Sequence, residues 1–369
     1  MKALHAFTLQ SPDNAFGGPI RVALNLAHEL KSRRVEVEFL GGSRGYSTTP
    51  NQIEGVTANL FAVRQIHPKL GFSGMVSAKL WIWAWRNVRK FDVVHIHLAR
   101  DLITLPVAFI CQMRKVPYVI QGHGMIDPTK RLLGRILDIL FVKRVLKHSK
   151  RNLYLTEQEQ SDYSEVFGQR LENLEFLPNG VPIPQTLPAL ERTQVSYISR
   201  LQARKRPTLF VEMAEQLIQK QIWSSFQIAG ADEGELSSVQ QRIADLNLGS
   251  QVKYVGPMNH DQVIEQLAQT QVLVLPSINE PFPMIVLEAL AAEVPVVITD
   301  TCGLAPYILR SNAGIVTDGS VRELVAATQE ILADQANFAS RAKELASNDF
   351  SMSRIGDKLL QIYATATGN

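Results

Sequence analysis

The sequence predicts an α/β protein made of two Rossmann-like domains, each with a doubly wound parallel sheet. Short apolar segments alternate with amphipathic helical segments along the whole chain, which is typical of βαβ units. At 369 residues, the chain exceeds what one hydrophobic core usually supports. A proline cluster at residues 178–188 interrupts the alternation, so we expect a linker between the domains there.

The composition is that of a soluble globular protein, with 46% hydrophobic and 20% charged residues. No apolar run approaches the roughly 20 residues that span a bilayer. The first seven residues have strand character and lack the apolar core of a signal peptide, so we expect a cytoplasmic protein. Cys111 and Cys302 lie far apart among apolar residues and predict buried thiols instead of a disulfide or a metal site.

Charge is distributed unevenly between the two halves of the chain. Residues 1–185 contain 24 Lys and Arg against 15 Asp and Glu, a net charge of +9, whereas the remainder carries −6. A basic first domain suggests an anionic partner such as lipid head groups or a pyrophosphate-linked acceptor. No nucleic-acid recognition motif accompanies the charge, so we do not expect a nucleic-acid partner.

In the first half, the pattern predicts strands at residues 3–7, 35–40, 58–63, 93–97, 118–120, 153–155 and 175–177. After the first strand, Gly17-Gly18 predicts a turn that lets the backbone approach a ligand, although an isolated pair is more often an ordinary turn. Neither a G-x-G-x-x-G fingerprint nor a Walker loop is present, which disfavours nicotinamide dinucleotides and ATP.

Two segments of the first half combine aromatic or apolar residues with basic ones. Trp81, Trp83 and Trp85 lie close to four cations, and their spacing of two predicts that at least one indole faces outward. Residues 130–151 carry eight basic residues and one acidic residue on an amphipathic pattern. Such a helix can lie on an anionic membrane surface, and a core-packed helix with solvated lysines is the alternative.

His123 lies between two glycines directly after the strand at residues 118–120. We expect an exposed side chain that faces a ligand, while a turn histidine without function is the alternative.

In the second half, the pattern predicts strands at residues 195–199, 226–229, 252–255, 272–275, 296–298 and 315–316. The first of these leads into Arg200 and the run Arg204-Lys205-Arg206, followed by a helix from about Thr208. Cations at a strand-to-helix turn favour phosphate binding, with a basic surface turn as the alternative.

The central stretch is the strand at 272–275, a polar turn, and a helix that starts at Pro283. The unpaired amides of Met284, Ile285 and Val286 would form an anion site at the carboxyl edge of the sheet. Glu280 and Glu288 flank that site. Carboxylates beside a phosphate cradle suit a sugar nucleotide, and the cradle argues against a glycosidase with two carboxylates.

Together these features resemble the retaining glycosyltransferases of the GT-B fold, family 4, over nearly the full length of the chain. Five motifs in order carry the resemblance: Gly17-Gly18, His123-Gly124, Pro178-Asn179-Gly180, Ser199-Arg200-Leu201 with Lys205, and Glu280-x7-Glu288. The resemblance implies two Rossmann-like domains with a deep inter-domain cleft. Residues 1–185 would form the acceptor-side domain, 186–350 the donor-binding domain, and 351–369 a helix that returns to the first domain.

The resemblance also implies roles for individual residues. Arg200 and Lys205 would bind the donor pyrophosphate and stabilise the leaving nucleotide. Glu280 and residues 281–285 would hold the sugar and phosphates, and Glu288 the ribose hydroxyls. His123 would contact the transferred sugar or the acceptor. The implied catalytic set is His123, Arg200, Lys205 and Glu280, and the implied donor-binding set is Gly17, Gly18, Asn179, Met258, Pro281, Phe282, Pro283, Met284, Ile285 and Glu288.

The chain departs from the family pattern at two positions. Pro283 stands where many relatives have glycine, which removes one N–H donor toward the sugar. Glu293 stands where a glycine is usual, which is expected to change only a helix end.

The resemblance implies a retaining, metal-independent hexosyltransferase without a cofactor. UDP-glucose is the expected donor, with GDP-mannose next, and the expected acceptor is a glycan or a lipid-linked saccharide in cell-surface or exopolysaccharide synthesis. Association with the inner face of the plasma membrane follows if the basic helix binds lipid. A non-catalytic sugar-nucleotide-binding scaffold on the same fold is the alternative.

Overall fold

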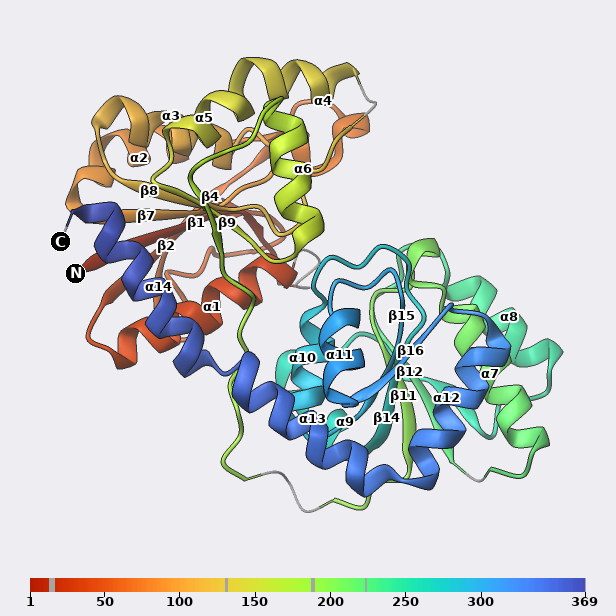
Figure 1. Ribbon diagram of the computed structural model, residues 1–369. Helices are drawn as coiled ribbons and strands as arrows, with labels where there is room; N and C mark the ends of the chain where they lie inside the picture. The colour runs from red at the N-terminus through yellow and green to blue at the C-terminus, as the bar shows by residue number, and fades with distance from the viewer. Residues whose placement is uncertain (13–16, 130–131, 187–189, 223, 369) are drawn as a thin grey trace. The chain divides into compact units, whose positions relative to one another are not determined.

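The computed structural model describes residues 1–12, 17–129, 132–186, 190–222 and 224–368. The chain forms two compact units, Met1–Gly180 with Met352–Asn369, and Val181–Ser351. Each unit is a mainly parallel sheet with helices against it (Figure 1). The predicted fold class, two doubly wound α/β sheets, is confirmed. We refer to the two parts as unit 1 and unit 2.

The division between the units falls at Gly180, five residues before the boundary expected from the sequence, and at Ser351. Residues 187–189 of the expected proline linker lie outside the described residues.

Unit 1 contains an eight-stranded sheet in the order β10-β9-β8-β7-β1-β2-β4-β3. Its strands are β1 (Lys2–Gln10), β2 (Glu36–Ser43), β3 (Gln52–Ile53), β4 (Val56–Ala62), β7 (Val93–His97), β8 (Tyr118–Gln121), β9 (Arg151–Tyr154) and β10 (Leu174–Phe176). All neighbours pair in parallel except β3 with β4. The order turns from one side to the other between β1 and β7, and ligands of such sheets lie at the carboxyl ends of the strands beside that point.

The seven strands expected in this half are present, each within a few residues of its predicted bounds. The sequence pattern missed β3 and the ribbon of β5 (Arg64–Gln65) with β6 (Met75–Val76), because two residues are too few to show alternation. The helices of unit 1 are α1 (Gly17–Ser32), η1 (Pro68–Gly74), α2 (Ala78–Asn87), η2 (Val88–Lys90), α3 (Thr104–Arg114), α4 (Leu132–Leu137), η3 (Asp138–Val142), α5 (Lys143–His148), α6 (Glu157–Phe167) and α14 (Met352–Thr367).

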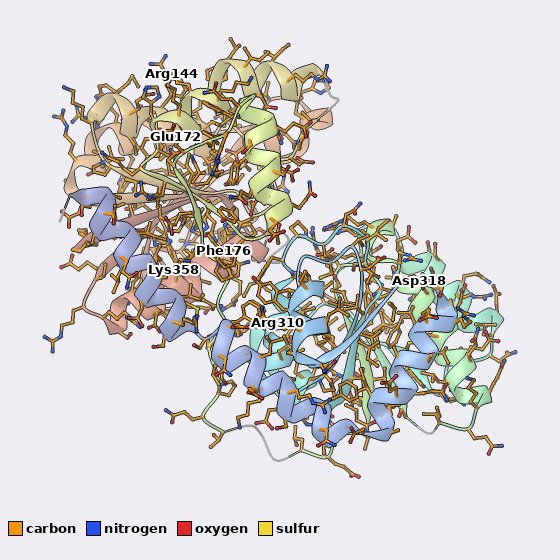
Figure 2. All side chains as sticks on the ribbon, viewed as in Figure 1. Arg144, Glu172, Phe176, Arg310, Asp318 and Lys358 are labelled. Atoms are coloured by element: carbon orange, nitrogen blue, oxygen red, sulfur yellow. The ribbon has the colours of Figure 1, made fainter. Side chains whose placement is uncertain are left out.

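The C-terminal helix α14 belongs to unit 1, where it packs against α1 (Figure 1). Arg33, directly after α1, forms an ion pair with Asp357 and donates to the carbonyl oxygen of Ser353 at 2.7 Å. Gly356 allows this close approach, because a Cβ there would lie 2.5 Å from Cγ of Glu29. Farther along the helix, Lys358 lies over the ring of Phe176 of β10, 5.1 Å from its centroid (Figure 2).

Unit 2 contains a six-stranded, fully parallel sheet in the order β13-β12-β11-β14-β15-β16. Its strands are β11 (Gln194–Ile198), β12 (Ser225–Ala229), β13 (Val252–Tyr254), β14 (Thr270–Leu275), β15 (Val296–Thr299) and β16 (Gly314–Thr317). Its helices are η4 (Ala203–Lys205), α7 (Pro207–Gln219), α8 (Leu236–Asp245), α9 (His260–Ala268), α10 (Met284–Ala291), α11 (Ala305–Ser311), α12 (Val321–Ala333) and α13 (Gln335–Asp349). The topological switch point of this sheet lies between β11 and β14.

The carboxyl ends of β11 and β12 approach each other closely, which requires a glycine. Gly230 has a φ of +147°, and a Cβ added there would lie 1.8 Å from the carbonyl oxygen of Ser199. Only glycine accepts both that conformation and that contact.

Both cysteines are buried thiols, as the sequence predicted. Among the described residues, no helix combines the length and the apolar character needed to cross a bilayer.

Candidate functional site

The switch point of unit 2 holds a buried ion pair. Lys205 follows β11 and Glu280 follows β14, and Lys205 Nζ lies 2.5 Å from Glu280 Oε1. Less than a tenth of either side chain is exposed. Burial lowers the pKa of Lys205, while the adjacent Glu280 carboxylate acts in the opposite direction. A lysine ammonium has three N–H donors, so Lys205 can bind Glu280 and still donate to an anion.

Arg204 adds a second cation to this pair and fixes the loop that carries Glu280. Its Nη1 lies 3.1 Å from Glu280 Oε1 and donates to the carbonyl oxygen of Asn279 at 2.9 Å. In return, the amide of Ile278 donates to the carbonyl oxygen of Arg204 at 3.0 Å. The cluster of Arg204, Lys205 and Glu280 has a net charge of +1 and therefore favours an anion. Arg204 belongs to the basic run that follows β11 and was not among the predicted site residues.

Arg200 also follows β11, but its guanidinium pairs with a carboxylate after the neighbouring strand β12. Its Nη1 lies 2.6 Å from Glu233 Oε1, and 42% of the Arg200 side chain is exposed. Sequence reasoning missed Glu233, because nothing in the chain marks which acid lies next to Arg200. Arg206 has a different role, since its Nη2 donates to the carbonyl oxygen of Gly319 at 2.9 Å and holds the turn.

The start of helix α10 differs from the prediction. The helix begins at Met284, and Pro283 is its N-cap with an extended ψ of 118°. The amide of Val286 donates to the carbonyl oxygen of Pro283 at 3.1 Å, so it is not one of the free amides expected there. Met284 and Ile285 remain as the first amides of the helix, which have no intrahelical acceptor.

The expectation that the backbone of residues 281–285 donates as a set also needs correction. Pro281 and Pro283 have no N–H, which leaves Phe282, Met284 and Ile285. The ring of Phe282 is buried and packs edge-on against Phe350, with centroids 5.8 Å apart. The Phe282 side chain therefore stabilises unit 2, and only its backbone remains a candidate for ligand contact.

Glu288 and Met258 lie on the same carboxyl side of unit 2. Glu288 lies in α10 with about 10% of its side chain exposed, and His260 Nδ1 of α9 lies 3.9 Å from its Oε1. Met258 is partly buried in the loop between β13 and α9, just before Asn259, which caps α9. His260 was not a predicted site residue.

In unit 1, Gly17 and Gly18 do not form the predicted turn after β1 but are the first residues of α1. Residues 14–16 of that predicted turn lie outside the described residues. Asn179 is buried, and its Oδ1 accepts from Gln121 Nε2 at 3.3 Å.

His123 is more strongly held than the sequence predicted. It is partly buried rather than exposed, with a left-handed φ of +54°. Its Nε2 lies 2.7 Å from His97 Nδ1, and the two rings are nearly parallel, with centroids 5.0 Å apart and planes 10° apart. Burial lowers the pKa of His123 to about 3, so the imidazole is neutral at pH 7.

A buried carboxylate fixes the turn that carries His123. Glu159 of α6 accepts from the amides of Gly124 and Leu155, each at 2.7 Å. Burial raises the pKa of Glu159 to about 7, against the opposing effect of these two hydrogen bonds. A Cβ on Gly122 would lie 2.4 Å from the hydroxyl oxygen of Tyr163, so this turn also needs a glycine at its start.

The implied site residues thus form two sets, each within one unit. Unit 1 contains Gly17, Gly18, His123 and Asn179, and unit 2 contains Arg200, Lys205, Met258, Glu280, Pro281, Phe282, Pro283, Met284, Ile285 and Glu288. In unit 2 they follow the carboxyl ends of β11, β13 and β14, where an open α/β sheet binds ligands. The buried Lys205, the neighbouring arginines and a helix start can stabilise the negative charge of a phosphate.

Comparison with known proteins gives matches over most of the chain. Residues 17–180 match the model of the "Glycosyl transferase 4-like domain", and residues 183–349 match that of the "Glycosyl transferases group 1". A D-inositol 3-phosphate glycosyltransferase of Kineococcus radiotolerans is 23% identical, over 99% of this chain and 94% of its own length.

Solved structures show the same fold. Alr3699/HepE of Anabaena in complex with UDP has a TM-score of 0.78 and 19% identity, covering 99% of this chain and all of that one. Its complex with UDP-glucose has a TM-score of 0.77 and 18% identity, with the same coverage. WaaG, a glycosyltransferase involved in lipopolysaccharide biosynthesis, has a TM-score of 0.71 and 18% identity, with full coverage of both chains. The chain is therefore an enzyme of the glycosyl transferases group 1, with the GT-B fold.

Proposed function

We propose that the enzyme is a retaining, metal-independent hexosyltransferase that moves glucose from UDP-glucose to a glycan or a lipid-linked saccharide in polysaccharide synthesis. The observation that carries this proposal is the cluster of Arg204, Lys205 and Glu280 at the switch point of unit 2. Support for the donor comes from the similar Anabaena protein, which was solved with UDP and with UDP-glucose.

In this proposal, the reaction breaks the bond between the anomeric carbon and the nucleotide diphosphate, and negative charge builds up on the departing phosphate. Lys205, Arg200 and the amides of Met284 and Ile285 stabilise that charge. Positioned cations of this kind can take the part that a divalent metal ion has in other sugar-nucleotide enzymes. Glu280 orients Lys205 and accepts from sugar hydroxyls, and Glu288 accepts from the ribose.

The first unit supplies the contacts to the acceptor in this proposal. His123 contacts the transferred sugar or the acceptor, and the basic character of residues 1–185 suits a pyrophosphate-linked or lipid-linked acceptor. The similarity to WaaG supports a saccharide acceptor at a cell surface. A non-catalytic scaffold that binds the same donor is the alternative, and it would bind UDP-glucose without releasing UDP.

Thermal unfolding in the presence of nucleotide sugars tests the choice of donor. UDP-glucose at about one hundred times its Kd is expected to raise the free energy of unfolding by roughly 2.7 kcal/mol. GDP-mannose, UDP-galactose and ADP-glucose at the same concentration serve as matched ligands, with EDTA present throughout. A larger shift with a guanine or adenine nucleotide would contradict the assignment of UDP-glucose.

We also propose that unit 1 binds anionic membranes through a patch formed by α3, α4 and η3. The exposed apolar side chains of this patch are Met113, Ile136, Ile139, Leu140 and Phe141, with Ile139 66% exposed. The opposite face of the segment, including Val142, Val145 and Leu146, is buried in the core of unit 1. Exposed apolar side chains beside basic ones are typical of helices that lie in a membrane surface.

The charges around the patch are arranged consistently with this proposal. The one acidic residue of the segment, Asp138, is buried and paired with Arg100 at 2.7 Å, so it does not repel an anionic surface. Arg144 lies over the ring of Phe109, 5.1 Å from its centroid, and Lys147 is exposed on the next turn (Figure 2). Of the three tryptophans, Trp85 is the outward one, 45% exposed, as the spacing predicted.

Replacing both Ile139 and Leu140 with serine is expected to lower binding to vesicles that contain phosphatidylserine about tenfold or more. Both replacements remove exposed apolar surface that the membrane would bury. Cosedimentation measures the binding. The control is Ile66→Ser, which removes a similarly exposed isoleucine of unit 1 outside the patch. Equal binding of all three proteins, or equal binding to vesicles of pure phosphatidylcholine, would contradict the membrane proposal.

A further inference from the structure

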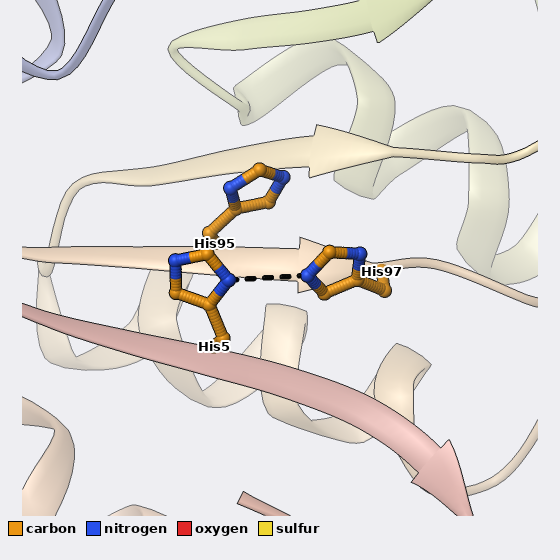
Figure 3. Close-up of side chains that lie close together, drawn as sticks. All are labelled: His5, His95 and His97. Carbon is orange, nitrogen blue, oxygen red and sulfur yellow. Dashed lines mark hydrogen bonds between the residues drawn. The ribbon is translucent and has the colours of Figure 1, made fainter. Parts of the chain in front are cut away.

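The interior of unit 1 contains a chain of histidines that ends at His123. His5 lies on β1, and His95 and His97 lie on β7, with His5 and His95 opposite each other in the register (Figure 3). Tyr363 reaches the same place from α14. These four side chains are at most 1% exposed. A group of this kind in the core must satisfy its polar atoms internally, because water does not reach it.

Four short contacts join the five side chains end to end. His95 Nδ1 lies 2.8 Å from the Tyr363 hydroxyl, which lies 3.0 Å from His5 Nε2. His5 Nδ1 lies 3.2 Å from His97 Nε2 (Figure 3). His97 Nδ1 lies 2.7 Å from His123 Nε2. Within the described part of the chain, His123 Nδ1 has no hydrogen-bond partner, so it is the open end of the chain.

These contacts allow only two arrangements of protons. Burial lowers the pKa of all four histidines, so each ring is neutral at pH 7 and has one N–H donor and one acceptor nitrogen. The tyrosine hydroxyl can donate to only one of its two histidine neighbours and must accept from the other. All four histidines therefore carry the proton on Nε2, or all four carry it on Nδ1.

The closed end of the chain selects between the two arrangements. His95 Nε2 and Gln121 Oε1 are both buried, and neither has a hydrogen-bond partner among the described residues. Burial has the largest effect on the pKa of His95 and lowers it. The Gln121 side chain acts in the opposite direction and raises this pKa. The Gln121 amide group is oriented by its bond to Asn179, which leaves the carboxamide oxygen for His95. Pairing these two atoms would satisfy both of them, and it requires a proton on His95 Nε2.

We infer that Tyr363, His5 and His97 hold His123 in the Nε2–H tautomer, so that its Nδ1 presents a lone pair to a hydroxyl group of the substrate. That the hydroxyl belongs to the transferred sugar or the acceptor rests on the proposed function, whereas the tautomer does not. His123 is then a hydrogen-bond acceptor and discriminates against a ligand that offers a carbonyl or phosphate oxygen at this point. Tyr363, His5 and His97 are positioning residues, because they act through His123.

Two other uses of the cluster fit the structure less well. Nitrogen atoms of His5, His95 and His97 lie within 4.8 Å of one another, close enough for a metal ion. Both ring nitrogens of His5 and both of His97 already take part in the chain, so an ion bound to these residues would break at least one of its contacts. Proton conduction is also disfavoured, because the chain ends at the buried carboxamide of Gln121, which does not accept a further proton at pH 7.

Nitrogen NMR of the 15N-histidine-labelled protein at pH 7.5 tests the inference. In the wild type, all four histidines are expected to show a protonated Nε2 and an unprotonated Nδ1. In Tyr363→Phe, His5 Nε2 would face an apolar ring, and a buried N–H without an acceptor is strongly disfavoured. The proton of His5 then moves to Nδ1, and His97 and His123 follow to the Nδ1–H tautomer. Tyr118→Phe is the matched control, since it loses one buried hydroxyl bond, to the carbonyl oxygen of Val145, outside the chain.

The same two variants distinguish a role of Tyr363 in positioning His123 from a general effect on the stability of the protein. We expect Tyr363→Phe to lower kcat/KM by roughly tenfold, the factor that one ordinary hydrogen bond contributes, and Tyr118→Phe to leave it unchanged. An Nδ1–H tautomer of His123 in the wild type, mixed tautomers among the four histidines, or a metal ion bound to them would overturn the inference. An unchanged His123 tautomer in a folded Tyr363→Phe variant would do the same. If the wild-type tautomers are as expected but no nucleotide sugar is turned over, the proposed function fails and the tautomer assignment stands.

Discussion

Replacing Lys205 with alanine is expected to lower turnover of UDP-glucose at least a hundredfold. Lys205 is the buried cation at the switch point of unit 2, and removal of one positioned stabiliser of developing charge typically has an effect of this size. Arg200→Ala is expected to have a similar effect on turnover. Release of UDP at saturating donor measures both. Near-normal turnover in both variants would contradict the roles assigned to Arg200 and Lys205.

The Lys205→Ala variant also removes one partner of a buried ion pair. Leaving the Glu280 carboxylate with Arg204 alone is expected to lower the free energy of unfolding by about 3 kcal/mol or more. A second variant, Lys205→Met with Glu280→Gln, removes both charges and should recover most of that stability without recovering turnover. Lys253→Ala, which removes an exposed lysine of β13, is the control for a change in net charge.

The second large effect is a steep loss of stability in acid. Burial lowers the pKa of His5 from 6.5 to about 3, and it also lowers the pKa values of His95, His97 and His123. Below pH 6.5, the unfolded chain binds protons at these positions that the folded protein does not bind. The contribution of these histidines to the free energy of unfolding is therefore fully present above pH 6.5. It is lost as the pH falls from 6.5 toward 3. Each such histidine contributes about 1.4 kcal/mol per pH unit in that window.

Glu159 acts in the opposite direction but does not reverse the trend. Because burial raises its pKa to about 7, the folded protein takes up a proton there as the pH falls from 7 toward 4.5, which stabilises it. Burial also raises the pKa of Asp101 and Asp162 above the ordinary aspartate value of 3.8, so these carboxyl groups oppose the trend as well. The four histidines outnumber the three carboxyl groups, so the net effect of acid is destabilising. With a total stability of roughly 5–15 kcal/mol, unfolding is expected near pH 5.

Urea unfolding at a series of pH values measures this slope. His5→Phe is expected to reduce the slope between pH 6.5 and 5 by about one proton, whatever its effect on stability at pH 7. His28→Gln, which replaces an exposed histidine of α1, is the matched variant for the loss of one histidine. A flat profile between pH 7 and 5 in the wild type would contradict the presence of four buried neutral histidines.

The strands and the donor half of the site were predictable because they depend on local pattern. A buried parallel strand is a run of apolar residues, and the residues that directly follow such strands lie at the carboxyl edge of the sheet, as Lys205 and Glu280 do. The start of α10 was misplaced by one residue because Pro283 fits both the first helical position and the N-cap. Because the helix starts one residue later, the amide of Val286 forms a hydrogen bond with the carbonyl oxygen of Pro283.

The histidine chain was beyond local pattern. His95 and His97 alternate on one strand, which places them on one face, but neither His5 nor Tyr363 is near them in sequence. Their contact depends on the order of the strands and on the return of α14 to unit 1. For the same reason, the glycines around His123 suggested exposure, while the structure shows a partly buried ring that contacts His97.

The central claim is that the strand-end site of unit 2 cleaves a nucleotide sugar without a metal ion. The most direct measurement is proton NMR of the purified enzyme with UDP-glucose and EDTA, following free UDP and the anomeric signal of the first glycoside formed on a saccharide acceptor. We predict release of UDP with formation of the α-anomer, and loss of both in Lys205→Ala. Binding of UDP-glucose without any release of UDP, or release that requires added Mg²⁺, would contradict the claim.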